Sequence, residues 1–198
     1  MNIRIKSYLF VDKLNENLLN NIKIFNNISL ILKPFDKNKS YIELEKLVLF
    51  CKKNQIEFYF YDNIQLVTKY KAKGIFLSTI NVKAYKHINA KRFSIIGQAH
   101  NQLEYFRKES QGCKTIMLSP LFFNPKYKPK DILGIIKFNL KSLNWRSNIC
   151  ALGGINKNTL KKIKTIRVNS IAFKSFLAKK NPLTNYSKWV FNKNLKLN

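Results

Sequence analysis

The sequence predicts an α/β fold with a parallel sheet, because short apolar segments alternate with segments of helical periodicity along almost the whole chain. With about eight such apolar segments in 198 residues, the chain falls at the lower end of the size range of a (β/α)8 TIM barrel. A doubly wound sheet is the alternative, but no glycine-rich motif follows the first apolar segment to support it. We therefore predict a single-domain barrel over residues 1–180, followed by a C-terminal helix and tail over residues 181–198.

The predicted strands are short apolar runs rich in β-branched and aromatic residues. They are Ser7–Val11, Ile28–Leu32, Ile56–Tyr61, Gly74–Leu77, Phe93–Gly97, Thr115–Leu118, Ile149–Leu152 and Ser170–Phe173. The predicted helices carry apolar residues three and four positions apart. They are Leu14–Phe25, Tyr41–Cys51, Ile64–Tyr70, Leu103–Glu109, Ile132–Leu143 and Thr159–Ile166.

Ligands of such a barrel bind at the carboxyl ends of its strands, so the residues that follow each predicted strand form the candidate site. They are Asp12, Lys33, Asp62, Ser78–Asn81, Gln98–His100, Ser119–Tyr127, Gly153–Gly154 and Lys174–Ser175.

The composition is strongly basic. The formal net charge is +27 and the pI is near 10.1, a balance that attracts anions from phosphorylated metabolites to nucleic acid. The lysines are dispersed along the chain, and no RNP-type aromatic motif, zinc-finger spacing or basic heptad region accompanies them. Nucleic acid is therefore disfavoured as a partner, and a solvated basic surface explains the charge equally well.

The cysteines and the absence of apolar targeting segments indicate a cytoplasmic protein. Cys51, Cys113 and Cys150 are too far apart in sequence to form a chelating pair, and we expect buried thiols in a reducing compartment. No signal-peptide pattern follows Met1, and no run approaches the ~20 apolar residues of a membrane span. We expect a soluble protein without membrane attachment; the sequence does not indicate its oligomeric state.

A glycine pair lies between the seventh predicted strand and the next helix. Gly153 and Gly154 follow the apolar run Ile149–Leu152, and Asn156 occupies the position of a helix N-cap. Adjacent glycines let backbone N–H groups approach a ligand, and the start of a helix favours an anion. This stretch therefore suits a phosphate site, although an ordinary glycine turn between strand and helix would have the same pattern.

Seven short motifs, taken in order, resemble the thiamine phosphate synthase and TenI family across nearly the whole chain. They lie at Ser7–Lys13, Phe60–Asn63, Lys73–Leu77, Ile95–His100, Ser119–Asn124 together with Leu133–Phe138, and Ala151–Asn156. The resemblance implies a reaction that joins hydroxymethylpyrimidine diphosphate to hydroxyethylthiazole phosphate and releases pyrophosphate. Its partners would be phosphorylated pyrimidine and thiazole molecules, and the implied chemistry is dissociative, which asks mainly for positioning and charge stabilisation.

The resemblance also implies Mg²⁺ as a cofactor. Asp62 stands where the family has a magnesium-binding aspartate, whereas Asn81 replaces the second one and brings no negative charge, which weakens the metal site. The alternative for Asp62 is a helix N-cap, because a helical segment begins at Ile64.

Several further positions match the phosphate-binding parts of the family. Gly153, Gly154 and Ser175 correspond to the site for the thiazole phosphate, and Lys174 could add charge there. Lys33 replaces a family arginine, which keeps the cation but loses the bidentate geometry of a guanidinium group. Exposed lysines without a function are the alternative for both lysine positions.

The loop Phe122–Lys130 corresponds to the family's cover over the diphosphate. Asn124 can replace a hydroxyl donor there, and Lys126 and Lys128 can replace a basic residue, with Lys126 assigned a catalytic role. An ordinary exposed loop in a basic chain is the alternative for these lysines. His100 matches a family histidine that transfers protons in TenI-like tautomerases, a task suited to imidazole near neutral pH. Its alternative role is that of a polar residue capping the helix that follows.

Other family positions are replaced, which leaves three functional hypotheses open. The replaced positions hold Ile31, Phe35, Tyr61, Thr79 and either Gln98 or Ala99. The first hypothesis is a divergent thiamine phosphate synthase, and the second is a TenI-like thiazole tautomerase. The third is a catalytically silent barrel that binds phosphorylated ligands, or nucleic acid through its charge.

Overall fold

The computed structural model describes residues 5–11, 22, 27–33, 40–85, 93–125 and 127–174. Within these residues, eight parallel strands pair in sequence order and the last pairs with the first, so that the sheet closes into a barrel. The strands are β1 (Lys6–Val11), β2 (Ile28–Leu32), β3 (Phe58–Tyr61), β4 (Gly74–Leu77), β5 (Ser94–Ala99), β6 (Thr115–Leu118), β7 (Asn148–Leu152) and β8 (Ser170–Phe173). The predicted (β/α)8 barrel is confirmed.

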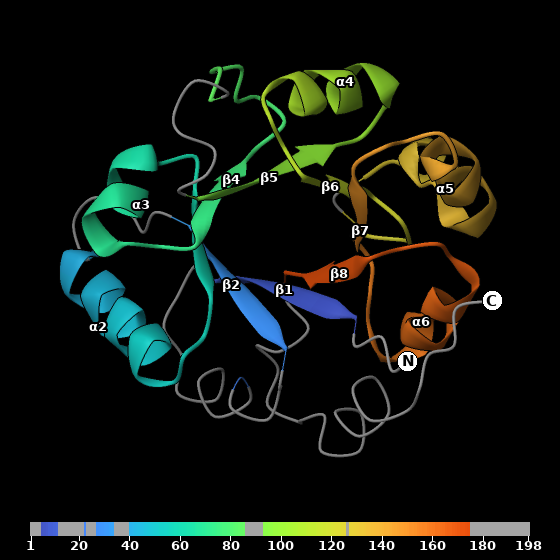
Figure 1. Cartoon of the computed structure of the whole chain (residues 1–198). Helices are drawn as coiled ribbons and strands as arrows, with labels where there is room; N and C mark the ends of the chain where they lie inside the picture. The colour runs from blue at the N-terminus through green and yellow to red at the C-terminus, as the bar shows by residue number, and fades with distance from the viewer. Residues whose placement is uncertain are drawn as a thin grey trace.

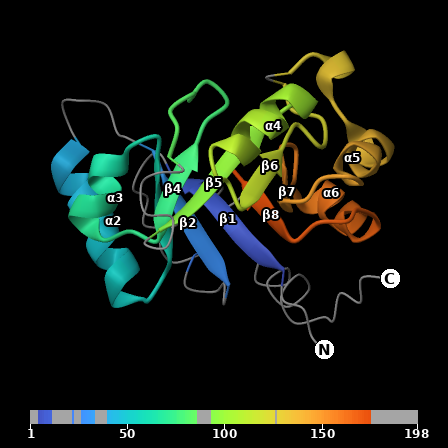
Figure 2. The same ribbon diagram turned by 45° about the horizontal axis from the view of Figure 1, so that its top comes forward.

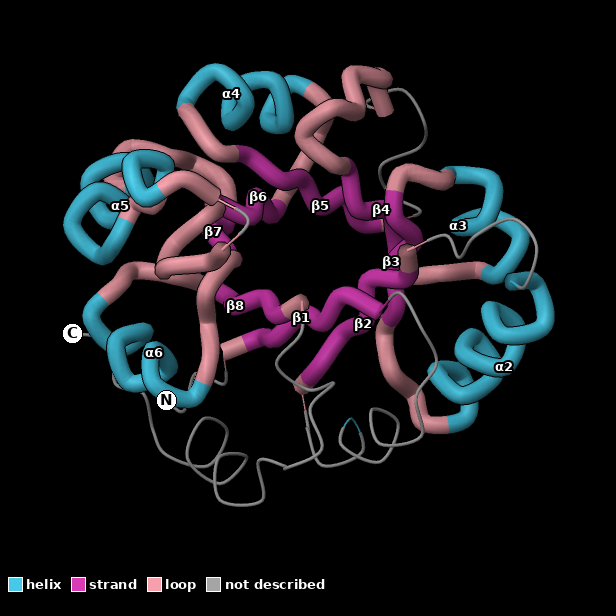
Figure 3. The backbone as a smooth tube through the Cα atoms, turned by 180° about the vertical axis from the view of Figure 1, so that it is seen from behind, coloured by secondary structure: helices cyan, strands magenta, loops and turns pink. Residues whose placement is uncertain are grey.

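Helices surround the barrel on its outside, as the view along its axis and the view from behind both show (Figures 1 and 3). They are α2 (Ser40–Lys53), α3 (Ile64–Tyr70), α4 (Gln102–Ser110), α5 (Gly134–Ser142) and α6 (Lys157–Leu160), with 3-10 turns at Pro129–Asp131 and Lys161–Thr165. The view turned by 45° shows α4 beside the segment that follows β4 (Figure 2).

Most predicted elements are found close to their predicted bounds, and the differences have local causes. The predicted strand Ile56–Tyr61 begins at Phe58, because the Ile56 N–H donates to the Cys51 carbonyl at the end of α2. The predicted helix Ile132–Leu143 begins at Gly134, because Ile132 is extended (ψ 127°) where the preceding 3-10 turn ends. The Leu133 and Gly134 N–H groups then donate to the carbonyls of Pro120 and Leu121 after β6. The predicted helix Thr159–Ile166 is a short α-helix from Lys157 followed by a 3-10 turn.

Some predicted features lie outside the described residues. These are the helix Leu14–Phe25, apart from a helical Ile22, the domain boundary at residue 180 and the C-terminal helix over residues 181–198. The candidate site positions Asp12, Lys126 and Ser175 and the replaced family position Phe35 also lie outside them.

Side chains alternate between two hydrophobic clusters, one inside the barrel and one between the barrel and its helices. The inner cluster is unusually aromatic for positions that must pack within eight strands. Tyr8 and Tyr59 meet edge to face at 5.9 Å, and Phe76 meets Phe10 at 5.0 Å and Tyr61 at 5.1 Å between ring centroids. Because these side chains fill the interior, a ligand must bind at one end of the barrel.

The amino end of the barrel is closed by an ion cluster. The Glu57 carboxylate, just before β3, accepts hydrogen bonds from Lys6 Nζ at 2.6 Å and from Ser29 Oγ at 3.2 Å, and it pairs with Lys73 Nζ at 3.1 Å. Burial alone would raise the pKa of Glu57, but the hydrogen bonds and charges of the two lysines outweigh it and lower the pKa. This cluster ties together the starts of β1, β2, β3 and β4.

Candidate functional site

The carboxylate of Asp62 is held at the carboxyl end of β3. Asp62 has a left-handed backbone (φ 51°), and its Oδ1 accepts hydrogen bonds from the Ser78 N–H at 3.0 Å and from Asn81 Nδ2 at 2.6 Å. The structure therefore brings together the two residues predicted to bind metal. The helix N-cap alternative for Asp62 is wrong, because Asn63 caps α3 by accepting from the Leu66 N–H at 3.0 Å.

Asn81 offers Asp62 a donor rather than a second oxygen ligand. Its Nδ2 points to Asp62 and also lies 3.4 Å from the Tyr85 hydroxyl, while its Oδ1 accepts from the Lys83 N–H at 3.0 Å. Mg²⁺ binds oxygen atoms, so the pair in this arrangement does not fit a two-ligand magnesium site. Among the residues that the structure describes, no three His, Cys, Asp or Glu residues gather as they would around a metal ion.

His100 lies at the carboxyl end of β5 in a fixed orientation. Its Nδ1 lies 3.0 Å from Glu104 Oε2, and the same oxygen accepts from the His100 backbone N–H at 2.7 Å. Since a carboxylate only accepts, the proton of neutral His100 belongs on Nδ1 and leaves Nε2 as the acceptor, 3.4 Å from Gln98 Nε2. The alternative that His100 caps α4 is wrong, because Asn101 is the N-cap and accepts from the Glu104 N–H.

The glycine pair forms a turn packed against the loop after β6. Gly153 (φ 98°) and Gly154 (φ 68°) both have left-handed backbones that favour glycine. A Cβ at Gly154 would lie 2.5 Å from the Phe122 carbonyl, and one at Gly153 would lie 3.0 Å from Pro120 Cα. The Phe122 N–H also donates to the Gly153 carbonyl at 3.0 Å. The backbones of two neighbouring strand ends thus meet at a distance that only glycine allows.

Two lysines lie over aromatic rings at the same end of the barrel. Lys33 Nζ, after β2, lies 5.4 Å from the centre of the Tyr61 ring, and Lys174 Nζ, after β8, lies 5.2 Å from that of Phe10. These rings belong to, or pack against, the inner cluster, which places both ammonium groups over the barrel interior. Burial, followed by the nearby Asp62 charge, raises the pKa of Tyr61, so this ring remains a neutral phenol.

The loop after β6 crosses the carboxyl end near His100. The Tyr127 ring lies 5.9 Å from the imidazole of His100, while Asn124 is half-buried and Lys128 is exposed. The Tyr127 N–H donates to the Asn124 carbonyl at 3.0 Å. Lys126 lies outside the described residues.

Comparison with known proteins decides the family. Residues 9–177 match the family model described as thiamine monophosphate synthase. The chain belongs to this family.

Two curated relatives of the chain are thiamine-phosphate synthases from Prochlorococcus marinus. The chain is 31% identical over 142 residues to the protein of strain SARG / CCMP1375, which covers 68% of the chain and 40% of that protein. It is 30% identical over 146 residues to the protein of subspecies pastoris, strain CCMP1986 / MED4, which covers 72% of the chain and again 40% of the relative. The match thus spans about two fifths of the length of these relatives.

Solved structures share the fold at low sequence identity. A thiamine phosphate pyrophosphorylase from Pyrococcus furiosus superposes with a TM-score of 0.74 at 16% identity, over 98% of this chain and 97% of that one. The 3-hexulose-6-phosphate synthase from Salmonella typhimurium gives a TM-score of 0.66 at 14% identity, over 98% and 100% of the two chains. At these identities, the likeness supports the barrel fold alone.

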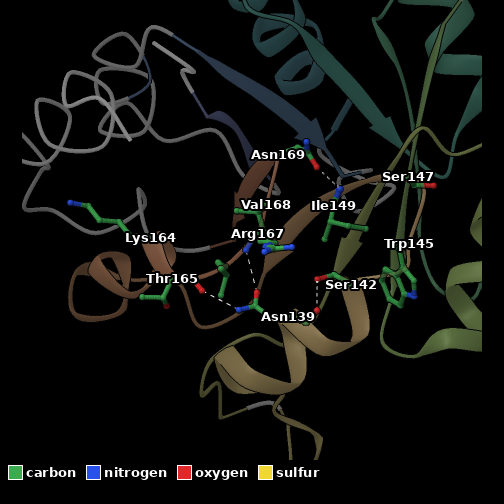
Figure 4. Close-up of a pocket in the computed structure, with 11 residues that line it drawn as sticks. Asn139, Ser142, Trp145, Ser147, Ile149, Lys164, Thr165, Arg167, Val168 and Asn169 are labelled. Atoms are coloured by element: carbon green, nitrogen blue, oxygen red, sulfur yellow. Dashed lines mark hydrogen bonds between the residues drawn. The ribbon is translucent and has the colours of Figure 1, made fainter. Parts of the chain in front are cut away.

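A hollow of about 490 Å³ lies at the opposite, amino end of the barrel, between α5 and the starts of β7 and β8 (Figure 4). Two of its asparagine side chains bond to the backbone of neighbouring segments. Asn139 donates to the Thr165 carbonyl and accepts from the Arg167 N–H, and Asn169 accepts from the Ile149 N–H (Figure 4). Contacts at this end of a barrel serve stability rather than catalysis.

Sequence reasoning missed the residues of α4 and of its C-cap, Gln111, that support the site. Glu104 could have been found, because an acidic residue three positions after Asn101 fits the pattern of a capped helix start. Lys108 and Gln111 gave no signal, since a lysine and a glutamine in a helix usually face solvent.

No helix in the described part of the chain is long and apolar enough to span a membrane.

Proposed function

We propose that the protein is a thiamine phosphate synthase that joins hydroxymethylpyrimidine diphosphate to hydroxyethylthiazole phosphate. One observation carries the proposal: the family match over residues 9–177 coincides with a carboxyl end that combines a backbone-lined glycine turn with lysines. Such an end suits two phosphorylated substrates, one held by N–H groups and one by ammonium groups. As a working location for this biosynthetic role we propose the cytoplasm.

The reaction needs one bond to break and one to form. The bond between the pyrimidine methylene carbon and the diphosphate oxygen breaks, and the oxygen keeps the electron pair. The thiazole nitrogen then attacks the resulting pyrimidine cation, forming a C–N bond and leaving thiamine phosphate and pyrophosphate. The barrel contributes by holding the two substrates in line and by stabilising the charge that develops on the departing diphosphate.

The residues at the strand ends take distinct roles in this scheme. Lys33, Lys126 and Lys128 stabilise the departing diphosphate, with Asn124 donating a hydrogen bond. Gly153 and Gly154 hold the thiazole phosphate, with Ser175 and Lys174 completing that side. No step is assigned to Mg²⁺, because the Asp62–Asn81 pair offers a carboxylate and an amide N–H rather than two oxygens; the cofactor remains a prediction from the resemblance.

The proposal is tested by incubating the purified chain with both substrates over a range of Mg²⁺ concentrations and measuring thiamine phosphate by mass spectrometry. We expect product formation that the Lys33→Ala variant reduces and the Glu57→Gln variant, altered at the opposite end of the barrel, leaves intact. A folded wild-type chain that makes no thiamine phosphate at any metal concentration would refute the synthase.

A TenI-like thiazole tautomerase is the second candidate, and the geometry of His100 favours it. Glu104 fixes the imidazole so that Nε2 can accept a proton, as a group that moves protons on a thiazole requires. This function predicts deuterium exchange into a thiazole phosphate that His100→Ala abolishes. Binding of thiazole phosphate without either reaction would instead support a catalytically silent barrel.

A further inference from the structure

Lys108 is a fully buried lysine on α4, a helix of nine residues on the outside of the barrel. Its alkyl chain crosses the outer face of β5 at Gly97, where a Cβ atom would lie 2.9 Å from Lys108 Cδ and 2.8 Å from Cys113 Sγ. Glycine at this strand position therefore provides the space through which the lysine side chain runs.

The ammonium group of Lys108 ends on the segment that carries Asn81. Lys108 Nζ donates to the Asn81 carbonyl at 2.8 Å, and Gln111 Nε2 donates to the same carbonyl at 3.0 Å and to the Lys83 carbonyl at 2.7 Å. Figure 2 shows this segment, which follows β4, beside α4. The Asn81 side chain in turn donates to Asp62 at 2.6 Å. A continuous path thus leads from a buried cation through one residue to the carboxylate.

A buried ammonium group is costly unless opposite charge and acceptors lie nearby. Burial lowers the pKa of Lys108, whereas Cys113, Asp62 and Glu104 act in the opposite direction and Arg107 acts with burial. The Asn81 carbonyl supplies a hydrogen-bond acceptor, and Asp62 supplies the opposite charge at longer range. The Asp62 charge therefore offsets part of the cost of burying the Lys108 ammonium group.

We infer that the Asp62 carboxylate is neutralised within the chain, by the Asn81 amide and the Lys108 ammonium group, in place of a metal ion shared between residues 62 and 81. Lys108 is the positioning residue of this arrangement. The inference rests on the site of the proposed function, but its test measures metal affinity and not turnover. The inference can therefore fail while the synthase proposal stands, and the synthase proposal can fail while the inference stands.

The first test measures binding of Mn²⁺, as a paramagnetic probe for Mg²⁺, to the substrate-free chain by electron paramagnetic resonance. We expect the wild type to bind Mn²⁺ no more tightly than Asp62→Asn does. Asn81→Asp replaces the N–H donor by a second carboxylate and should gain one site, about tenfold tighter or more, that is lost when Asp62→Asn is added. A stoichiometric wild-type site that Asp62→Asn removes would overturn the inference.

The second test separates the charge of Lys108 from its structural contact. Lys108→Met removes the ammonium group and should raise the Mn²⁺ affinity of the Asn81→Asp chain, because a nearby positive charge repels the ion. Gln111→Met is the matched control, since it removes a hydrogen bond to the same carbonyl but no charge, and should not raise the affinity. Equal affinities in the two variants would refute the electrostatic role, and if Lys108→Met does not fold, the first test decides alone.

Discussion

The two ends of the barrel hold a carboxylate through different kinds of partner. At the amino end, Glu57 is held by two lysines and a serine, and its charge is balanced by groups that tie four strands together. At the carboxyl end, Asp62 accepts from an amide and a backbone N–H, while Lys33 and Lys174 lie over aromatic rings. Salt bridges thus join neighbouring strands at the amino end. At the carboxyl end, N–H donors hold the carboxylate, and two lysine ammonium groups lie near the mouth of the barrel.

This difference predicts which measurements respond to changes at each end. Substitutions at the amino end should lower stability and leave ligand binding intact. Substitutions at the carboxyl end should alter ligand binding, and they should alter stability only where backbones are in contact.

The largest effect is expected for Gly154→Ala, at the point where the two backbones meet. A Cβ there would lie 2.5 Å from the Phe122 carbonyl, and φ is 68°, so the substitution adds a backbone clash to left-handed strain. We expect a loss of about 2–4 kcal/mol in the free energy of unfolding, measured by urea denaturation, and loss of thiazole phosphate binding.

Gly134→Ala is the matched control for that substitution. Gly134 has a similar φ of 63°, but nothing lies within 4 Å of its Cβ position. The Gly134→Ala variant should lose only the contribution of left-handed backbone strain, about 1–2 kcal/mol in the free energy of unfolding. If both alanine variants lose the same stability, the close approach of the two loops has no energetic weight and the comparison between the ends weakens.

The next effect concerns the orientation of His100. Glu104→Gln keeps the size of the side chain but replaces a carboxylate that accepts from both Nδ1 and the backbone N–H. If the protein is a tautomerase, we expect about a tenfold slower proton exchange on thiazole phosphate with little change in melting temperature, against roughly 10²-fold or more for His100→Ala. An unchanged exchange rate in Glu104→Gln would show that the histidine needs no orienting partner.

How far the sequence predicted these features depends on the range of the interactions. Strand positions such as Ile28–Leu32 and Gly74–Leu77 were predicted to the residue, because apolar runs bounded by polar residues are a local signal. The start of α5 at Gly134 was not predicted, because it depends on hydrogen bonds to the distant loop after β6.

The candidate site divides in the same way. Asp62, Asn81 and the glycine pair were predicted from short motifs and their order, and they lie at the carboxyl end of the barrel. The direction of the Asn81 amide and the burial of Lys108 could not be predicted, because both depend on the packing of α4 against Gly97 on a neighbouring strand. A lysine in a helical pattern reads as a surface residue until that contact is known.

A smaller effect is expected for the lysines at the carboxyl end. Lys33→Ala and Lys174→Ala each remove one positive charge from the mouth, and each should weaken binding of inorganic pyrophosphate by about 1 kcal/mol at low salt. The difference from wild type should shrink as ionic strength rises, because salt screens exposed charges. Calorimetric titration with pyrophosphate at two salt concentrations measures the loss of affinity and its dependence on salt. The control is Lys6→Ala, at the amino end, which should bind pyrophosphate like the wild type.

The smallest effect is expected at the amino end, in Glu57→Gln. The pKa of Glu57 is lowered below its ordinary value of 4.5, so the folded chain binds this proton less readily than the unfolded chain does. The carboxylate therefore contributes stability that is fully present above pH 4.5 and is lost as the pH falls through the lower, folded-state pKa. Because the side chain is 39% exposed, the contribution at neutral pH should be only about 0.5–1 kcal/mol. Urea denaturation of the wild type and of Glu57→Gln, near neutral pH and in acid below the folded-state pKa, gives the free energy of unfolding of each. The difference between the two free energies should narrow in acid. A difference independent of pH would assign the effect to packing and remove the electrostatic contrast between the two ends.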